Sequence, residues 1–143
     1  MRIRRLNHSV YQIEYHLVFG TKYRRKILKN YVKAEFIKGL IKVQRKFPDW
    51  YIPKVNTGDD HVHMLIELPP KYSVSFVVQT IKTVTSIILK HKFKFINEIY
   101  QDGNLWSVGY FVSTIGLNES QIKKYIERQS QFDIGQDATK EFS

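Results

Sequence analysis

The sequence contains no cysteine in its 143 residues. This absence excludes a disulfide-stabilised scaffold and a zinc site made of thiolates, and it fits a protein of a reducing, intracellular compartment. No apolar run reaches the roughly 18 residues that a membrane-spanning helix needs, and the N-terminus lacks the apolar core of a secretion signal. We therefore expect a cytoplasmic protein with no membrane partner.

Acidic residues are also scarce. Thirteen Asp and Glu face 23 Lys and Arg, which gives a net charge of +10. A domain this basic is suited to a polyanion, most simply nucleic acid, although a solvated basic surface is the alternative. The length predicts a single domain over residues 1–143, and a hydrophobic content of 43% is enough for a core.

The order of predicted elements is that of a split β-α-β fold. Alternating apolar residues predict strands over residues 10–21, 50–57, 61–68 and 105–115. Helical periodicity predicts helices over residues 30–47, 74–91 and 118–132, with a short helical piece over 93–100. Residues 1–9 read as a basic arm and residues 133–143 as a polar tail. This order predicts an α+β fold, ferredoxin-like or RRM-like, with an antiparallel sheet, helices on one face, and a further helix at the C-terminus.

Two helix starts and the side chains of one helix are predicted in more detail. Asn30 and Ser73 are residues that commonly cap helices, so each is expected to cap the helix that follows it. In the helix over residues 74–91, either Val84 or Thr85 continues the apolar repeat, and the polar side chains that accompany it are Lys82, Thr83, Thr85, Ser86 and Lys90.

His61 and His63 open an apolar strand and lie two residues apart. Alternate residues of a strand share a face and lie about 6.5–7 Å apart, so the two imidazoles can converge on one metal ion. The alternative is a pair of structural histidines, because the pattern alone is a weak signal. Its position favours a site, since the pair follows a tight turn and is flanked by Asp59 and Asp60. His16, in the first strand, is expected to be packed or hydrogen-bonded rather than a ligand.

The last helix carries a second polar feature. Tyr125 and Gln129 are four residues apart and therefore lie on one helical face, which also carries Ile122 and Ile126. A glutamine on an apolar stripe needs a partner for its amide, and a metal ion could accept the carbonyl oxygen. The alternative is that Tyr125 is a core aromatic residue and Gln129 lies at the edge of the stripe.

Several ordered motifs resemble one known family. They are YHLVFGTKYRRKIL at residues 15–28, DHVHMLIELPP at 60–70, SVSFVVQTIKTVTS at 73–86, WSVGYFVSTIG at 106–116 and YIERQ at 125–129. Together they resemble the single-tyrosine HUH endonucleases that act as transposases of small bacterial and archaeal insertion sequences. The likeness covers nearly the whole chain.

The resemblance implies a set of roles. Tyr125 is the nucleophile, and His61, His63 and Gln129 hold a divalent ion, Mg²⁺ or Mn²⁺. The activity is cutting and rejoining of single-stranded DNA through a 5′-phosphotyrosine, in the prokaryotic cytoplasm at the nucleoid. A phenol with a pKa of about 10 needs help to attack, and a bound ion polarises the scissile phosphate.

The resemblance also implies a homodimer that binds DNA hairpins, in which the catalytic helix of one subunit can complete the site of the other. Residues 106–115 are the candidate for pairing between subunits, because edge strands readily pair. Gly116, with residues 113–118, is the predicted hinge in front of the catalytic helix.

DNA contacts are predicted mainly from charge. The loop over residues 22–29 combines Lys and Arg with Tyr23, a mixture that grips a backbone and stacks a base. The predicted contacts, which should give a steep salt dependence, are Arg2, Arg4, Arg5, Lys22, Arg24, Arg25, Lys26, Lys54, Lys82 and Lys90.

Three rival functions remain open on the sequence. The first is a replication initiator or conjugative relaxase with the same chemistry, and the short chain with one candidate tyrosine favours the transposase. The second is a domesticated relative that processes repeated hairpins of its host genome. The third is a non-catalytic RNA-binding module, which would carry base-stacking aromatic residues on its sheet and need no metal.

Overall fold

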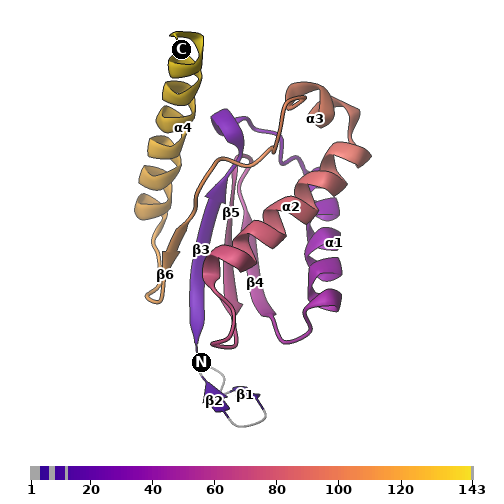
Figure 1. Ribbon diagram of the computed structural model, residues 1–143, viewed down its shortest axis with the longest axis vertical. Helices are drawn as coiled ribbons and strands as arrows, with labels where there is room; N and C mark the ends of the chain where they lie inside the picture. Colours follow the sequence, from indigo (N-terminus) through magenta and orange to yellow (C-terminus); the bar gives the residue numbers. More distant parts are fainter. Residues whose placement is uncertain (1–3, 7–8, 12, 143) are drawn as a thin grey trace.

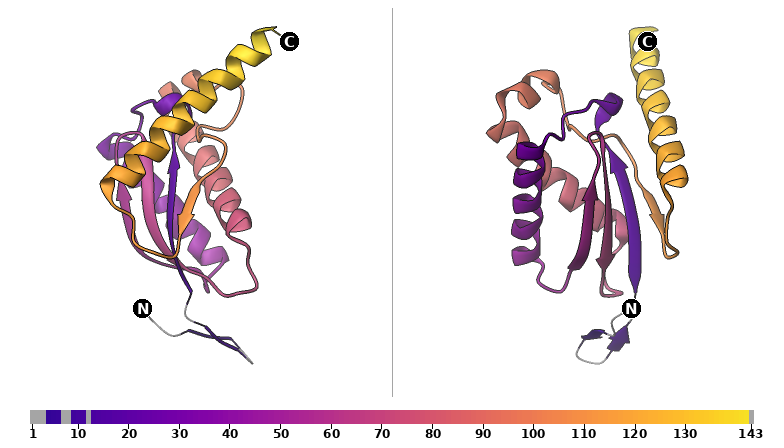
Figure 2. Two further views of the ribbon diagram at one scale, coloured as in Figure 1. Left: turned by 90° about the vertical axis from the view of Figure 1, so that its left-hand side faces the viewer. Right: turned by 180° about the vertical axis from the view of Figure 1, so that it is seen from behind.

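A four-stranded antiparallel sheet lies at the centre of the molecule, with helices on both faces (Figure 1). The computed structural model describes the backbone of residues 4–6, 9–11 and 13–142, and the side chains of residues 13–135. Helices α1 (Asn30–Lys46) and α2 (Val74–Lys92) cover one face, and the last helix, α4 (Glu119–Phe142), lies against the other (Figure 2). Within those described ranges, no helix is both long and apolar enough to cross a membrane.

The sheet has the strand order of the predicted split β-α-β fold. Its strands are β3 (Glu14–Gly20), β4 (Tyr51–Thr57), β5 (His61–Glu67) and β6 (Phe111–Ser113), and their order in space is β4-β5-β3-β6. Each neighbouring pair is antiparallel. The fold class predicted from the sequence is therefore confirmed.

The two central strands are buried on the face beneath α1 and α2, and β3 is also buried at Val18 on the other face. Leu17 and Phe19 of β3 pack into the main core beneath α1 and α2, whereas Val18 packs on the opposite face beneath α4. Val62 and Met64 of β5 pair with Phe19 and Leu17 and join the same main core. Residues between them in the sequence therefore point towards α4, as alternation along a strand requires.

The helices on the main core begin close to their predicted positions. They are α1 (Asn30–Lys46), α2 (Val74–Lys92) and the short α3 (Lys94–Ile99). The Ser73 hydroxyl accepts a hydrogen bond from the Phe76 amide, so the predicted cap of α2 is confirmed. The prediction for Asn30 is wrong: Asn30 is the first residue of α1, and Lys29 precedes it without a side-chain cap.

Three polar residues of α2, Lys82, Thr85 and Ser86, are buried, whereas Thr83 is exposed. The segment after α3 explains why they are buried. Ser86 Oγ accepts a hydrogen bond from the Leu105 amide, and Thr85 Oγ1 accepts one from the Trp106 indole. Lys82 donates to the Ser107 carbonyl. An irregular backbone inside the core needs such partners, because unpaired buried polar groups are costly.

That segment is not the single strand predicted over residues 105–115. Only β6, Phe111–Ser113, joins the sheet, with an isolated bridge between Thr21 and Trp106. Gly109 has a φ of +92°, a backbone conformation that interrupts a strand and favours glycine. The predicted alternation fails there: Trp106 is buried, whereas Val108 is 71% exposed.

Both ends of the chain also differ from expectation. The strand predicted over residues 10–21 is divided into β2 (Ser9–Tyr11) and β3, and β2 pairs with β1 (Arg4–Leu6) in a separate two-stranded sheet. The last helix, α4 (Glu119–Phe142), continues through the residues that were predicted to be a polar tail.

A short 3₁₀ turn, η1 (Lys22–Arg24), follows β3 at the end of the sheet where His61 begins β5.

Candidate active site

The two histidines lie on the face of the sheet that α4 covers. His61 pairs with Gly20 and His63 with Val18, and the Val18 side chain packs against α4. Ile126 of α4 lies directly over Gly20, since a Cβ built on that glycine would be 3.0 Å from the Ile126 Cδ1 atom. The helix therefore crosses the sheet close to the histidine pair.

The His61 imidazole is fixed by a carboxylate. Its Nδ1 lies 2.8 Å from Asp60 Oδ1, and Arg24 Nε donates to Asp60 Oδ2 at 3.0 Å. A carboxylate can only accept, so Nδ1 is the donor and Nε2 is the nitrogen available to an ion. This is the arrangement in which a metal-binding histidine is held by a second residue.

His63 lies beside a third histidine. Its Nε2 is 3.5 Å from Nδ1 of His16, which confirms that His16 is packed and hydrogen-bonded. Both line a cavity of about 230 Å³ with Lys54 and Asn56 of β4. Burial lowers the pKa of His63, and the positive charges of His16, His61 and Lys54 lower it further. The neutral imidazole, which is the form that binds metals, is therefore favoured.

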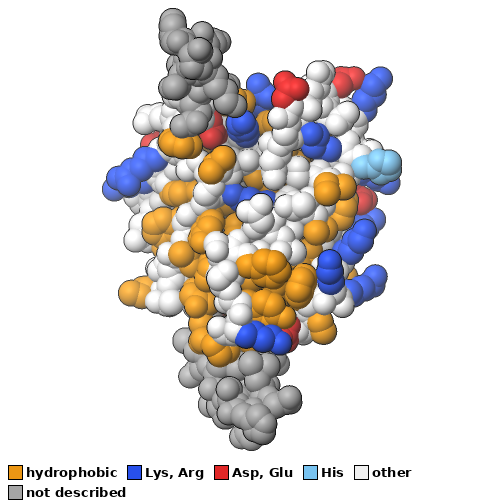
Figure 3. Space-filling view, viewed as in Figure 1, with side chains coloured by type: hydrophobic (Ala, Val, Ile, Leu, Met, Phe, Trp, Pro, Cys, Tyr) orange, Lys and Arg blue, Asp and Glu red, His pale blue; other side chains and the backbone are white. Residues whose placement is uncertain are grey.

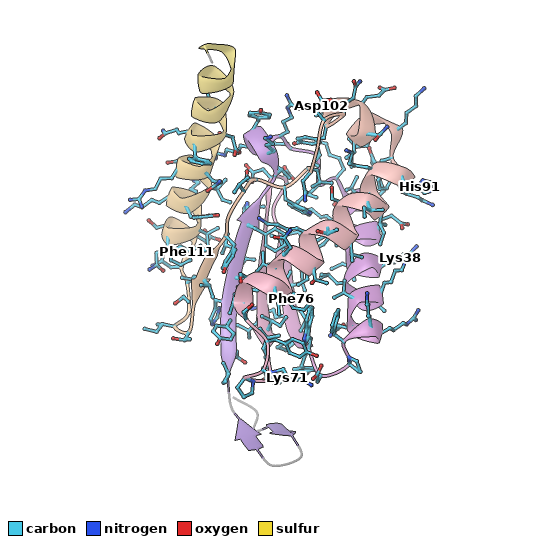
Figure 4. The ribbon with its side chains drawn as sticks, viewed as in Figure 1. Lys38, Lys71, Phe76, His91, Asp102 and Phe111 are labelled. Carbon is cyan, nitrogen blue, oxygen red and sulfur yellow. The ribbon has the colours of Figure 1, made fainter. Side chains whose placement is uncertain are left out.

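Tyr125 lies at the other side of the same face. Its ring packs 5.8 Å from that of Phe111 on β6, at the contact where Figure 4 labels Phe111 beside α4. The hydroxyl is buried, has no hydrogen-bond partner among the described residues, and lies against Gly109. Burial, together with the negative charge of Asp133, raises the pKa of Tyr125 to about 12. The phenol is thus neutral and shielded in this arrangement.

Gln129 is not placed with the histidines. Its side-chain amide donates to the Val108 carbonyl, and its Oε1 faces Gly109, beside the Tyr125 hydroxyl. Strand β3 separates β5, which carries the histidines, from β6. Among the described residues, no three histidine or carboxylate side chains form a metal-binding group. The structure therefore brings His61 to His63 and Tyr125 to Gln129, but it leaves these two halves apart.

Asp133 lies in the segment that the sequence predicts to be a polar tail. It is 2% exposed, accepts a hydrogen bond of 2.6 Å from the Ser107 hydroxyl, and accepts another of 3.1 Å from the Tyr23 amide. One signal could have found it. Tyr125, Gln129 and Asp133 follow one another at intervals of four, so Asp133 continues the functional face of the helix.

Of the lysines predicted to contact DNA, some are bonded to backbone carbonyls within the protein and others are accessible at its surface. Lys82 is wrong as a contact, because it is buried and its ammonium donates to the Ser107 and Gly109 carbonyls at 2.7 and 2.6 Å. Burial lowers its pKa to about 8, against the opposing effect of Asp133. Lys90 donates to the Gly103 carbonyl at 2.7 Å. Lys26 and Lys54 are exposed, and Lys22 is half-buried.

Two arginines of the basic loop already have partners. Arg24 is paired with Asp60, and the Arg25 guanidinium lies 5.1 Å from the centre of the Tyr23 ring and 5.3 Å from that of Tyr100. The predicted contacts Arg2, Arg4 and Arg5 lie outside the residues whose side chains are described. Basic side chains of the α2 side are scattered around the margins rather than gathered in one patch (Figure 3).

Comparison with known proteins identifies the family to which this chain belongs. The family described as "Transposase IS200 like" matches residues 9–129. The chain belongs to the IS200-like transposase family. It is 33% identical over 131 residues to the transposase for insertion sequence element IS200 of Salmonella typhimurium, a match that covers 90% of this chain and 84% of that protein. The family to which the sequence motifs point is therefore confirmed.

Solved structures agree with the fold. This IS200-like transposase superimposes on the crystal structure of a candidate transposase from Deinococcus radiodurans R1 with a TM-score of 0.76 and 26% identity, over 88% of this chain and 97% of that one. The REP-associated tyrosine transposase, solved bound to a REP hairpin, superimposes with a TM-score of 0.54 and 16% identity, over 82% and 64% of the two chains. The chain is thus a DNA transposase, which favours a DNA-cleaving enzyme over the rival of a non-catalytic RNA-binding module.

Proposed function

We propose that this transposase cuts and rejoins single-stranded DNA at the ends of an insertion sequence, with Tyr125 as the nucleophile. One observation carries the proposal. The helix that bears Tyr125 and Gln129 packs on the face of the sheet that presents His61 and His63. A nucleophile and a pair of metal-type ligands thus occupy one surface of a small, strongly basic domain.

The reaction is a phosphoryl transfer. The Tyr125 phenolic oxygen attacks the scissile phosphorus, and the bond from phosphorus to the 3′ oxygen breaks. The phenol proton leaves as that oxygen becomes a 3′-OH, and the 5′ phosphate stays on Tyr125 as a phosphodiester. Because the tyrosine ester retains the energy of the broken bond, a 3′-OH can reverse the step on another strand without ATP.

The residues that would hold a divalent ion, Mg²⁺ or Mn²⁺, are His61, His63 and Gln129. The two histidines suit this role, since His61 already has its Nδ1 engaged by Asp60 and both lie on one face of β5. A bound ion would supply polarisation of the phosphate and neutralisation of developing charge. Nitrogen and oxygen ligands of this kind are compatible with Mn²⁺ as well as with Mg²⁺.

Activity on this scheme requires a rearrangement. Gln129 is bonded to Val108 and the Tyr125 hydroxyl is buried against Gly109, so α4 has to move before both can reach the histidines. Alternatively, α4 of a second copy completes the site in trans. Gly116 is the proposed hinge, since it is exposed and a Cβ added there would meet no atom of the described residues within 4 Å.

The substrate and assembly follow from three features. The net charge of +10 suits a DNA backbone. A transposase of the same fold has been solved bound to a REP hairpin, so we propose DNA hairpins at the element's ends as the recognised structure. The edge strand β6 carries the exposed side chain of Val112, and Val108 and Ile115 nearby are 71% and 77% exposed. An apolar sheet edge of this kind suits pairing with a second copy in a homodimer.

The decisive experiment is covalent capture of the DNA. The protein is incubated with a single-stranded hairpin oligonucleotide and Mg²⁺ or Mn²⁺, and protein–DNA adducts that survive denaturation are measured on a gel. We expect an adduct with the wild-type protein and with the control Tyr31→Phe, whose side chain is exposed on α1. We expect none with Tyr125→Phe, which removes a hydroxyl that has no hydrogen-bond partner among the described residues and so leaves the fold intact. An adduct that persists in Tyr125→Phe, or that forms without metal, would contradict the proposal.

A further inference from the structure

We infer that Asp60 is a positioning residue that orients the metal ligand His61, and that Arg24 holds the Asp60 carboxylate in place for this task. The inference rests on the proposed metal site and assigns roles to two residues outside it. It also replaces the predicted role of Arg24, which was a DNA contact.

The Asp60 carboxylate joins the other two side chains. One oxygen, Oδ1, lies 2.8 Å from His61 Nδ1, and the other, Oδ2, accepts from Arg24 Nε at 3.0 Å. Asp60 is 9% exposed, so water does not compete freely for either oxygen. A carboxylate removed from water needs partners for both oxygens, and here a cation and an imidazole supply them.

The imidazole ring of His61 has little freedom in this position. A Cβ added to Gly58 would lie 2.4 Å from His61 Cε1 and 2.8 Å from Nδ1, so the ring lies directly against the glycine backbone. The Gly58 amide also donates to the His61 carbonyl at 2.9 Å, which closes the turn. The turn therefore supports the ring from one side while Asp60 fixes its Nδ1.

This geometry determines which ring nitrogen of His61 is available to a metal ion. With its proton directed at Asp60, Nδ1 is a donor, and the lone pair of His61 is on Nε2. A carboxylate on the second nitrogen also makes the imidazole a better ligand, and loss of such a partner typically weakens metal binding by about 10–100-fold. Asp60 thus selects both the tautomer and the basicity that a metal ligand requires.

The neighbouring carboxylate provides a contrast within the same turn. The Asp59 side chain is 58% exposed and its only described ion pair is with Lys33, at 3.9 Å. It has no contact with His61 among the described hydrogen bonds and ion pairs. The two adjacent aspartates therefore have different environments, and only Asp60 can orient the ligand.

The backbone conformation around Arg24 supports its ion pair with Asp60. Tyr23 and Arg24 have φ values of 62° and 56°, a left-handed conformation that is costly for residues other than glycine. The turn is held to Asp60 by a further bond, because the Thr21 amide donates to the Asp60 carbonyl at 2.9 Å, while the Thr21 hydroxyl donates to the Arg25 carbonyl at 2.7 Å. The strained turn and the carboxylate thus form one unit next to His61.

Two measurements test the inference. The first is the tautomer of His61 in the wild-type protein, read from long-range ¹H–¹⁵N correlations of its ring without added metal. The second is the affinity for Mn²⁺, measured by electron paramagnetic resonance of free Mn²⁺ in Asp60→Asn, in the matched control Asp59→Asn, and in Arg24→Gln. Circular dichroism confirms that each variant is folded.

The inference predicts a protonated Nδ1 on His61 in the wild type and its loss in Asp60→Asn. It also predicts that Asp60→Asn weakens Mn²⁺ binding by about 10–100-fold, that Asp59→Asn leaves it unchanged, and that Arg24→Gln has a smaller effect in the same direction. A proton on Nε2 in the wild type would overturn the inference even if Asp60→Asn failed to fold. Equal Mn²⁺ affinities for Asp60→Asn and Asp59→Asn would also overturn it.

The result is distinguishable from failure of the proposed function. If the wild type forms the covalent DNA adduct but Asp60→Asn binds Mn²⁺ normally, the positioning role fails and the proposed function stands. If the wild type binds no Mn²⁺ and forms no adduct, the proposed metal site fails, and the role of Asp60 as a support for it fails with it.

Discussion

The Asp133 carboxylate accepts a hydrogen bond of 2.6 Å from the Ser107 hydroxyl, and this bond ties the middle of α4 to the loop before β6. The same carboxylate accepts a hydrogen bond from the Tyr23 amide. The Lys82 ammonium, on α2, donates to the Ser107 carbonyl. The Asp133 carboxylate therefore joins α4 to two separate parts of the molecule, the loop at Ser107 and the turn at Tyr23, and Lys82 of α2 in turn holds that loop. It holds α4 in the position where the Tyr125 hydroxyl is buried against Gly109.

We predict that Asp133→Asn loosens α4. The substitution keeps the size of the side chain but removes a buried charge that accepts two hydrogen bonds, at a cost of about 1–3 kcal/mol. Hydrogen exchange should then accelerate in the amides of residues 119–135, while those of β3 and β5 keep their protection. Glu127→Gln, on the exposed side of the same helix, is the matched control. Equal protection of α4 in both variants would show that Asp133 does not hold the helix.

A second prediction concerns Lys82 and pH. Its pKa is about 8 in the folded protein, against an ordinary value of 10.5. Between these values the unfolded chain binds more protons than the folded one, so stability rises as pH increases from about 8 towards 10 and is lost as pH falls through 8. Tyr100 and Tyr125, whose pKa values are raised to about 12, act in the opposite direction only above pH 10.

Urea unfolding at pH 7, 8, 9 and 10 tests this dependence. We expect the free energy of unfolding of the wild type to rise over this range, and we expect the rise to disappear in Lys82→Met. Lys42→Met, which changes an exposed lysine of α1, should keep the slope of the wild type. A slope that survives in Lys82→Met would assign the dependence to other groups.

The sequence predicts the parts of this molecule that repeat with a regular period. Two-residue alternation places His61 and His63 on one face, and a serine before a helical repeat predicts the cap of α2, because these relations depend on neighbours in the chain. The family could also be recognised, since its motifs are continuous. The pairing of His61 with Asp60 was within reach for the same reason, as the two residues are adjacent.

The wrong predictions concern residues whose burial or conformation depends on contacts with residues distant in the sequence. Lys82 reads as a surface residue, and it is buried because the irregular backbone at Ser107 and Gly109 needs a donor. Residues 105–115 alternate like a strand, but a positive φ at Gly109 ends the pattern. Asp133 reads as part of a tail, and its partners Ser107 and Tyr23 are distant in sequence. No local pattern reports such partners.

Gly116 gives a third prediction, which tests the proposed hinge. Proline at this position would fix φ near about −65° and restrict Ile115 as well. Because the space around Gly116 is open, we expect the free energy of unfolding to stay close to that of the wild type in both Gly116→Pro and Gly116→Ala. Adduct formation should fall by roughly tenfold or more in the proline variant and remain normal in the alanine variant. Normal cleavage and joining by Gly116→Pro would rule out a hinge at this residue.

Lys54 gives the last prediction, on DNA binding. It is exposed on β4 and lines the cavity that also contains His16 and His63, so a phosphate near the histidines lies within its reach. Loss of one phosphate contact should weaken binding of a hairpin oligonucleotide and reduce the slope of log affinity against log salt by about one. Fluorescence anisotropy between about 50 and 300 mM salt measures this slope in the range where counterion release is steep.

Lys38 is the matched control for Lys54. It carries the same charge but projects from α1, on the face of the sheet opposite to α4 (Figure 4), and its side chain is 70% exposed. Lys38→Ala should therefore leave the salt slope unchanged, whereas Lys54→Ala lowers it. If both variants lower the slope equally, the DNA senses only the net charge of the protein. If neither does, the bound strand does not pass over the histidine face.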